Sequence, residues 1–208
     1  MGAWLSNFST AIPTISGNSA LTGTYDIPVA SLRVRGVVTN TPAIDAYRGA
    51  GRPELIYALE RLMDHVAAVT GISRVDVRRR NLIKADQMPY PMAVGITIDS
   101  GEMPALFETA LQRADWGGFA ERREAARNKG LYRGIGLGMY LEKSGDGSDG
   151  GVHISFGANG HMTVLASQQC NGQGHRMTLT QILSDKLGYD ADKITVQQGD
   201  SSTMPEGT

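Results

Sequence analysis

Residues 46–54 read Ala-Tyr-Arg-Gly-Ala-Gly-Arg-Pro-Glu, and this stretch decides how the first half of the chain folds. It joins a strand-like run to a long amphipathic helix through a turn of small residues. Gly49 and Gly51 let a ligand approach the backbone, and Pro53 suits a first helical turn. The start of such a helix attracts anions, and Arg48 adds a planar fork of donors. We therefore predict an anion-binding cradle, with a plain connecting turn as the alternative.

Residues 168–175 form a second turn of the same kind, Gln-Gln-Cys-Asn-Gly-Gln-Gly-His. The turn follows an alternating run at 162–166 and precedes a helical pattern with one apolar face. Gln173 lies between two glycines, and its side-chain amide can both donate and accept hydrogen bonds. The sequence therefore predicts that this turn reads a polar group of a ligand.

Together, the two motifs resemble those of the molybdopterin-binding large subunit of the molybdenum hydroxylases. This is the xanthine dehydrogenase and aldehyde oxidase family, which also contains aerobic carbon monoxide dehydrogenase. The resemblance runs from about Tyr25 to Thr208. It implies that the cofactor is held by pterin contacts alone, with no protein side chain on the metal. The cofactor-binding residues that it implies are Arg48, Gly49, Gly172, Gln173, Gly174 and His175.

The resemblance also bears on the substrate. The carbon monoxide branch carries a cysteine-containing loop where this chain has Gly49-Ala50-Gly51, which disfavours carbon monoxide. Xanthine-type members place a phenylalanine at the position of Ala50, so a methyl group there indicates a different or roomier pocket. Glu142 falls where the family's substrate channel is lined, with a salt bridge as the alternative role. The implied reaction is oxidation of an aldehyde or an N-heterocycle with oxygen derived from water.

The family pattern implies a larger assembly than this chain. We expect molybdopterin with molybdenum in the cytosine dinucleotide form, iron–sulfur clusters and FAD on partner subunits or domains, and a cytoplasmic location. In the family, a Gly-x-Gly-Glu motif far downstream supplies the general-base glutamate, and this chain has no such motif. We therefore expect an internal piece of a larger subunit, with no catalytic residue of its own and inactive alone. Two alternatives stay open: a pterin-binding member without turnover, and a nucleotide-phosphate binding module that uses only the first turn.

Composition supports a globular protein and excludes several other classes. The chain is 41% hydrophobic and carries a net charge of −1, which gives no long-range attraction to nucleic acid or an anionic membrane. No apolar run reaches the length of a membrane helix. The single cysteine, Cys170, excludes an internal disulfide, and we expect it to be a small buried residue. The basic run 78–80 is interpreted as a solvated or partner-facing helix end.

Hydrophobic periodicity predicts a mixed α+β fold. The resemblance implies that this fold is a partial molybdopterin-binding domain of a larger subunit. We place a boundary after residue 129, with the first motif in residues 1–129 and the hairpin and second motif in residues 130–208. Ser100 is expected to cap the helix that follows it. The predicted elements are a half-exposed strand near 32–38, helices over 53–70 and 73–82, a polar segment of two helices over 103–129, a hairpin pairing 152–156 with 162–166, a helix after 175 and a strand near 194–196.

Overall fold

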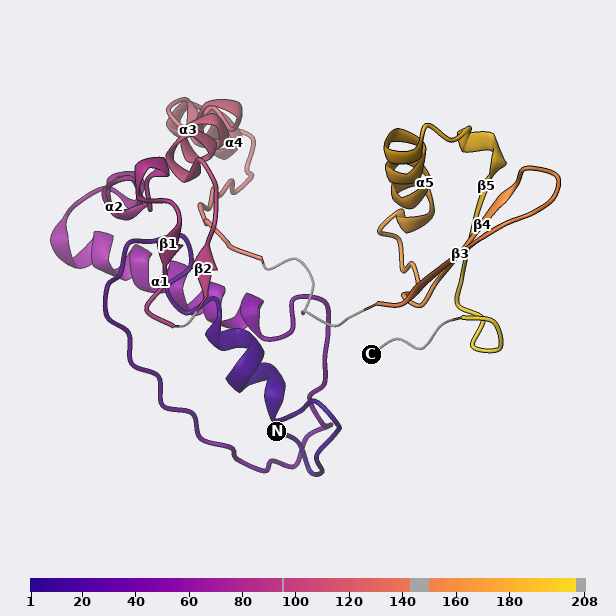
Figure 1. Ribbon diagram of the computed structural model, residues 1–208. Coiled ribbons are helices and arrows are strands. Elements are labelled where there is room, and N and C mark those ends of the chain that lie inside the picture. The colour runs from indigo at the N-terminus through magenta and orange to yellow at the C-terminus, as the bar shows by residue number, and fades with distance from the viewer. Residues whose placement is uncertain (95, 143–149, 205–208) are drawn as a thin grey trace. The chain divides into compact units, whose positions relative to one another are not determined.

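The computed structural model describes residues 1–94, 96–142 and 150–204 of the 208-residue chain. These residues divide into two compact units, Met1–Glu142 and Lys143–Thr208 (Figure 1). The predicted α+β class is confirmed, because helices and small sheets occur together along the chain. The predicted division after residue 129 stays a prediction.

The first unit is mainly helical. Helix α1 (Arg52–Thr70) begins directly after the first glycine turn and ends at Gly71, whose left-handed conformation suits a helix C-cap. Helix α2 (Arg74–Asn81) is capped by Ser73, whose hydroxyl accepts the N–H of Asp76, as predicted. The remaining elements are η1 (Ile12–Ser16), η2 (Ala85–Gln87), the antiparallel strands β1 (Tyr90–Pro91) and β2 (Thr97–Ile98), α3 (Met103–Arg113) and α4 (Phe119–Arg127).

Helix α1 buries a narrower apolar stripe than the broad face that the sequence predicts. Leu59, Met63 and Ala67 recur every fourth residue and are buried, whereas Leu62 and Val69 on the predicted apolar face are exposed. The buried stripe packs in one cluster with residues from other elements of the unit, namely Tyr25, Val77, Leu82, Phe107, Leu111 and Met139.

A buried charge cluster fixes α1 against α2, and it corrects the interpretation of the basic run at Arg78, whereas Arg79 and Arg80 are exposed. Arg78 is fully buried, not solvated. Its Nε donates to Glu60 Oε2 at 2.8 Å, and its Nη2 lies 3.0 Å from Asp64 Oδ1. Tyr25 donates its hydroxyl to the other Glu60 oxygen at 2.6 Å, and burial is the main cause that raises the pKa of Tyr25. The charge pattern of the sequence did not reveal this burial, because Glu60 and Asp64, the acids that pair with Arg78, lie on the preceding helix α1.

The second unit is a three-stranded sheet with one helix packed on it. Strands β3 (Val152–Phe156) and β4 (Met162–Ala166) form the predicted antiparallel hairpin, and β5 (Ile194–Gln198) pairs parallel to β4. Helix α5 (His175–Leu187) and the short η3 (Ala191–Lys193) connect β4 to β5. Met162, Val164 and Val196 form the core with α5. The second glycine turn therefore lies at the carboxyl end of β4, directly before α5.

Two local predictions are wrong. Residues 32–38 form no strand in the described part of the chain, and their large apolar side chains stay exposed. One backbone hydrogen bond, from the N-terminal amine of Met1 to the Val37 carbonyl at 2.8 Å, does not make a ladder. Ser100 does not cap α3: its hydroxyl donates to Asp99, and Glu102 occupies the N-cap position without a side-chain hydrogen bond. Within the described residues, every helix is too short or too polar to cross a lipid bilayer.

Candidate functional site

The first turn, residues 47–51, holds three consecutive left-handed residues. Gly49, Ala50 and Gly51 have φ angles of 105°, 46° and 85°. Alanine rarely adopts a positive φ, so this conformation needs support from the surroundings. Some of this support is local, because the N–H of Ala50 donates to the Tyr47 carbonyl at 2.7 Å and that of Arg52 donates to the Gly49 carbonyl at 3.0 Å.

Close packing also fixes this turn. A Cβ on Gly51 would overlap the carbonyl group of Ile12 in η1, whose carbon would lie only 2.8 Å away. A Cβ on Gly17, just after η1, would lie 2.9 Å from the Gly51 carbonyl oxygen. Because the two backbones touch without side chains between them, the turn rests directly on the N-terminal segment.

Arg48 and Arg52 leave this turn with different surroundings. Arg48 is exposed, and its guanidinium makes no hydrogen bond or ion pair with the residues that the structure describes. Arg52 is largely buried and bonded: its Nη1 lies 2.7 Å from Glu142 Oε1 and 3.3 Å from the Gly49 carbonyl, and its Nε lies 3.2 Å from Ser19 Oγ. Arg48 therefore has a donor fork available for a ligand, whereas Arg52 serves the fold.

The second turn, residues 171–174, is open rather than packed. Gly172 and Gly174 have φ angles of 107° and 77°, and a Cβ on either would meet nothing within 4 Å. Helix α5 has no side-chain cap on its first N–H groups. The Gln173 side chain folds back, and its Oε1 accepts the N–H of Asn171. A ligand at this turn would compete only with that local bond for the amide.

The amides of the second turn face the thiol of Cys170. The N–H groups of His175, Gly172 and Gly174 lower the pKa of this thiol below its ordinary value. Cys170 is half-exposed, so the expectation of a buried apolar residue is wrong. The same amides favour a negatively charged group, as the start of a helix does in general.

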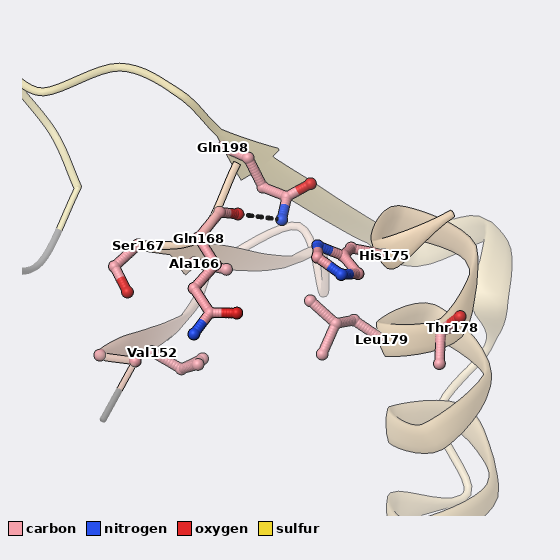
Figure 2. A pocket seen from close by; sticks show the side chains of 10 residues that line it. Val152, Ala166, Ser167, Gln168, His175, Thr178, Leu179 and Gln198 are labelled. Carbon is pink, nitrogen blue, oxygen red and sulfur yellow. Dashed lines mark hydrogen bonds between the residues drawn. The ribbon is translucent and has the colours of Figure 1, made fainter. Parts of the chain in front are cut away.

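A cavity of about 260 Å³ lies beside this turn, where β3 begins and β4 and β5 end. His175 and Leu179 extend from α5 toward the strand ends that carry Gln168 and Gln198 (Figure 2). Gln198 donates its amide to the Gln168 carbonyl at 2.6 Å. The Ser167 hydroxyl also lines the cavity, and its buried oxygen has no hydrogen-bond partner among the described residues. The cavity thus combines apolar walls with polar side chains.

The sequence-predicted residues fall into two groups. Arg48, Gly49 and Ala50 share the first turn, and Glu142, ninety residues later in the chain, reaches it through Arg52. Gly172, Gln173, Gly174 and His175 share the second turn. Sequence reasoning missed Ser19, Gln198 and Ser167, and it gave Arg52 no role. Arg52 stood inside the quoted motif and could have been noticed, whereas no local pattern marks the other three.

Both turns suit an oxygen-rich anionic ligand. Each offers glycine backbone at the start of a helix without a side-chain cap, and the first adds the Arg48 guanidinium. Among the described residues, no group of three or more His, Cys, Asp or Glu side chains could hold a metal ion. Each turn, taken by itself, thus has the backbone geometry of an anion-binding helix start.

Comparison with known proteins identifies the family. A molybdopterin cofactor-binding domain family matches residues 1–82, and a second family with the same description matches residues 109–208. The chain is 32% identical to the gamma subunit of the 6-hydroxypseudooxynicotine dehydrogenase complex of Paenarthrobacter nicotinovorans, covering 96% of this chain and 26% of that protein. It is also 32% identical to the carbon monoxide dehydrogenase large chain of Hydrogenophaga pseudoflava, covering 89% of this chain and 25% of that protein.

A solved structure agrees. Quinoline 2-oxidoreductase from Pseudomonas putida 86 superposes with a TM-score of 0.84 at 29% identity, over 95% of this chain and 27% of that one. The chain therefore belongs to the molybdopterin-binding large subunits of the molybdenum hydroxylases, which confirms the resemblance inferred from the two motifs. It spans about a quarter of the length of the curated relatives that it matches.

Proposed function

We propose that this chain forms a section of the cofactor-holding wall of a molybdenum hydroxylase that oxidises an N-heterocycle or an aldehyde with oxygen from water. The observation that carries the proposal is the pair of uncapped helix starts, each entered through a glycine turn, inside the two segments that match molybdopterin-binding domains. The general-base glutamate would come from outside this chain, and these residues alone would be inactive.

Each turn would hold the cofactor differently. Arg48 would grip an anionic oxygen of the pterin cofactor with two parallel N–H groups, and the Gly49 backbone would allow close approach. Gly172 and Gly174 would leave room at the second turn, where the Gln173 amide would turn from Asn171 toward the cofactor. His175 would contact it from the cavity side. When bound, the molybdenum pterin supplies the redox chemistry, and these residues bind and orient it.

The substrate proposal rests on the first turn and on the relatives. Ala50 would face the pocket with a methyl group, which leaves space for a ring, and Glu142 would lie near the same wall. Quinoline, in the name of the superposed structure, is an N-heterocycle. One similar protein is a carbon monoxide dehydrogenase, but the Gly49-Ala50-Gly51 turn has no cysteine, which favours a heterocycle or aldehyde as the substrate.

The remaining proposals concern the assembly. One relative is named as the gamma subunit of a complex, which supports a multisubunit enzyme in general. We propose that the cofactor is the cytosine dinucleotide form, that iron–sulfur and FAD partners carry the electrons away, and that the enzyme works in the cytoplasm. We also propose that residues 1–129 and residues 130–208 form separate parts of the molybdopterin-binding region, and that each contributes one cofactor contact.

The test measures molybdenum per protein and rate per molybdenum in the full-length subunit assembled with its partners. Arg48→Ala should weaken cofactor retention by about tenfold or more, because losing hydrogen bonds to a charged group costs about 1.5–3 kcal/mol. Cofactor retention in Arg48→Lys should lie between that of the original protein and that of Arg48→Ala, since lysine keeps the charge but loses the planar pair of donors. Gln173→Glu should lower the molybdenum content more than Gln173→Ala does, because the new carboxylate would repel the negative charge of the cofactor.

Two exposed residues supply matched controls. Arg80→Ala on α2 and Gln112→Ala on α3 remove the same side-chain types far along the chain from both turns. Both controls should keep the original molybdenum content. If every Arg48 and Gln173 variant also keeps it, neither turn holds the cofactor, and the proposal fails at these positions.

A further inference from the structure

The Arg52 guanidinium joins three segments that are far apart in the sequence. It contacts the Ser19 hydroxyl, the Gly49 carbonyl and the Glu142 carboxylate at 3.2, 3.3 and 2.7 Å. We call these four residues the Arg52 anchor. We infer that Arg52 and Glu142 are positioning residues, whose ion pair holds the first turn in its left-handed conformation. Glu142 then acts on the site through Arg52 and the Gly49 carbonyl.

The turn needs such an external hold. Residues 49–51 are all left-handed, and Ala50 carries a side chain in that region, at φ 46°. The two backbone hydrogen bonds that close the turn involve only residues 47, 49, 50 and 52, so they move with the turn and do not fix it to the rest of the unit. Packing against Ile12 fixes one side of the turn. The Arg52 anchor adds a second hold, through a contact on the carbonyl of Gly49 itself.

The geometry assigns different work to the two partners. Arg52 Nη1 contacts both the Gly49 carbonyl and Glu142 Oε1, so the carboxylate orients the nitrogen that supports the turn. Only arginine has the planar set of donors that reaches Ser19 from Nε at the same time. A lysine would keep the charge opposite Glu142 but could not maintain all three contacts.

The exposure of the pair separates positioning from global stability. The side chain of Arg52 is 15% exposed and that of Glu142 is 45% exposed. A pair with one partner this open to water adds little to the free energy of unfolding. We therefore expect loss of the Glu142 charge to loosen the turn while leaving the unfolding midpoint nearly unchanged.

The consequence for the cofactor rests on the proposed function, because Arg48 directly precedes the Gly49 peptide that Arg52 holds. A loosened turn would let the Arg48 guanidinium sample more positions, and ordering it again would oppose cofactor binding. Glu142→Gln should therefore lower cofactor retention without removing any group that touches the cofactor.

The test uses the full-length protein, prepared both without and with cofactor. Hydrogen exchange is measured at the amides of residues 50 and 52, which close the turn. In the cofactor-free protein, Glu142→Gln and Arg52→Lys should each accelerate exchange at both amides by about three- to fivefold, as expected when a local opening loses an ion pair of this exposure. Glu142→Asp keeps the carboxylate and should restore most of the protection.

The matched control is Glu108→Gln. Glu108 forms an exposed, long-range ion pair with Arg79 at 2.6 Å, remote in sequence from the turn. The Glu108→Gln substitution should leave hydrogen exchange at the amides of residues 50 and 52 unchanged. Unaltered exchange in Glu142→Gln, or equal acceleration in Glu108→Gln, overturns the positioning role. Acceleration confined to the Arg52 anchor variants supports it.

Molybdenum content then separates this inference from the proposed function. Faster exchange together with a several-fold drop in molybdenum per protein supports both. Faster exchange with unchanged molybdenum supports the positioning role and shows that the first turn does not hold the cofactor. In that case the assignment of Arg48 fails, while the Arg52 anchor stands.

Discussion

The two glycine turns have nearly the same sequence pattern and very different surroundings. At the first turn, Gly51 touches the backbone of Ile12 and leaves no room for a side chain. At the second, Gly172 and Gly174 face open space. Glycine is therefore required at the first turn by both packing and backbone conformation, and at the second by conformation alone.

This difference has a functional consequence. A packed turn can present Arg48 from a fixed backbone, whereas an open turn can move its Gln173 side chain from a local bond to a ligand. We therefore expect the first turn to keep its conformation and the second turn to rearrange more readily when a ligand binds. Four predictions test the contrast, from the largest expected effect to the smallest.

Arg78→Ala should lower the free energy of unfolding most, because it removes the buried charge that fixes α1. This helix begins directly after the first turn. Glu60 would be left without its arginine, and breaking a buried ion pair from one side costs about 3–5 kcal/mol. Urea unfolding followed by circular dichroism measures this loss. Arg80→Ala, on the exposed side of the same helix, should change the free energy of unfolding very little. A loss below about 1 kcal/mol for Arg78→Ala would contradict a buried pair.

Gly51→Ala should destabilise the first unit by about 2–5 kcal/mol. A Cβ would overlap the Ile12 carbonyl, and overpacking commonly costs about 1–3 kcal/mol, with a further cost of about 1–2 kcal/mol for a left-handed alanine. The same urea titration measures it. If Gly51→Ala proves as mild as Gly174→Ala, the first turn is not packed against η1.

Gly174→Ala should cost only about 1 kcal/mol, because the new methyl group meets no atom and only the left-handed conformation at φ 77° opposes it. Hydrogen exchange at the first turn should stay unchanged in this variant. A cost equal to that of Gly51→Ala would remove the contrast between the two turns.

Cys170 supplies the smallest and most local test of the second turn. The N–H groups around its thiol lower its pKa in the folded chain, so the reactive thiolate should form at a lower pH than in the urea-unfolded chain. The rate of alkylation by iodoacetamide against pH measures both midpoints. A depressed pKa stabilises the fold above the unfolded-state pKa, and this contribution is lost as the pH falls through the folded-state pKa. Identical midpoints in the two states would show that the amides do not face the thiol.

Local patterns predicted much of the secondary structure. Pro53 and Gly71 bracket α1, Ser73 caps α2, and the Asn159–Gly160 turn forms the hairpin, because each of these signals acts within a few residues. The strand near 32–38 failed for the opposite reason. Its alternation is local, but a strand needs a ladder of backbone hydrogen bonds, and the structure shows one isolated bond here, from the N-terminal amine of Met1 to the Val37 carbonyl.

By itself, the sequence determined the α+β class, the two glycine turns and the molybdopterin-binding family, because helix signals, turn signals and motifs are read along the chain. Only the tertiary structure decided that Arg78 is buried between Glu60 and Asp64, and that Arg52 joins Ser19 and Gly49 to Glu142. From the sequence alone, an arginine that binds a ligand cannot be distinguished from one that forms a buried ion pair. Their roles differ because a carboxylate distant in sequence lies close in space, and only folding sets that distance.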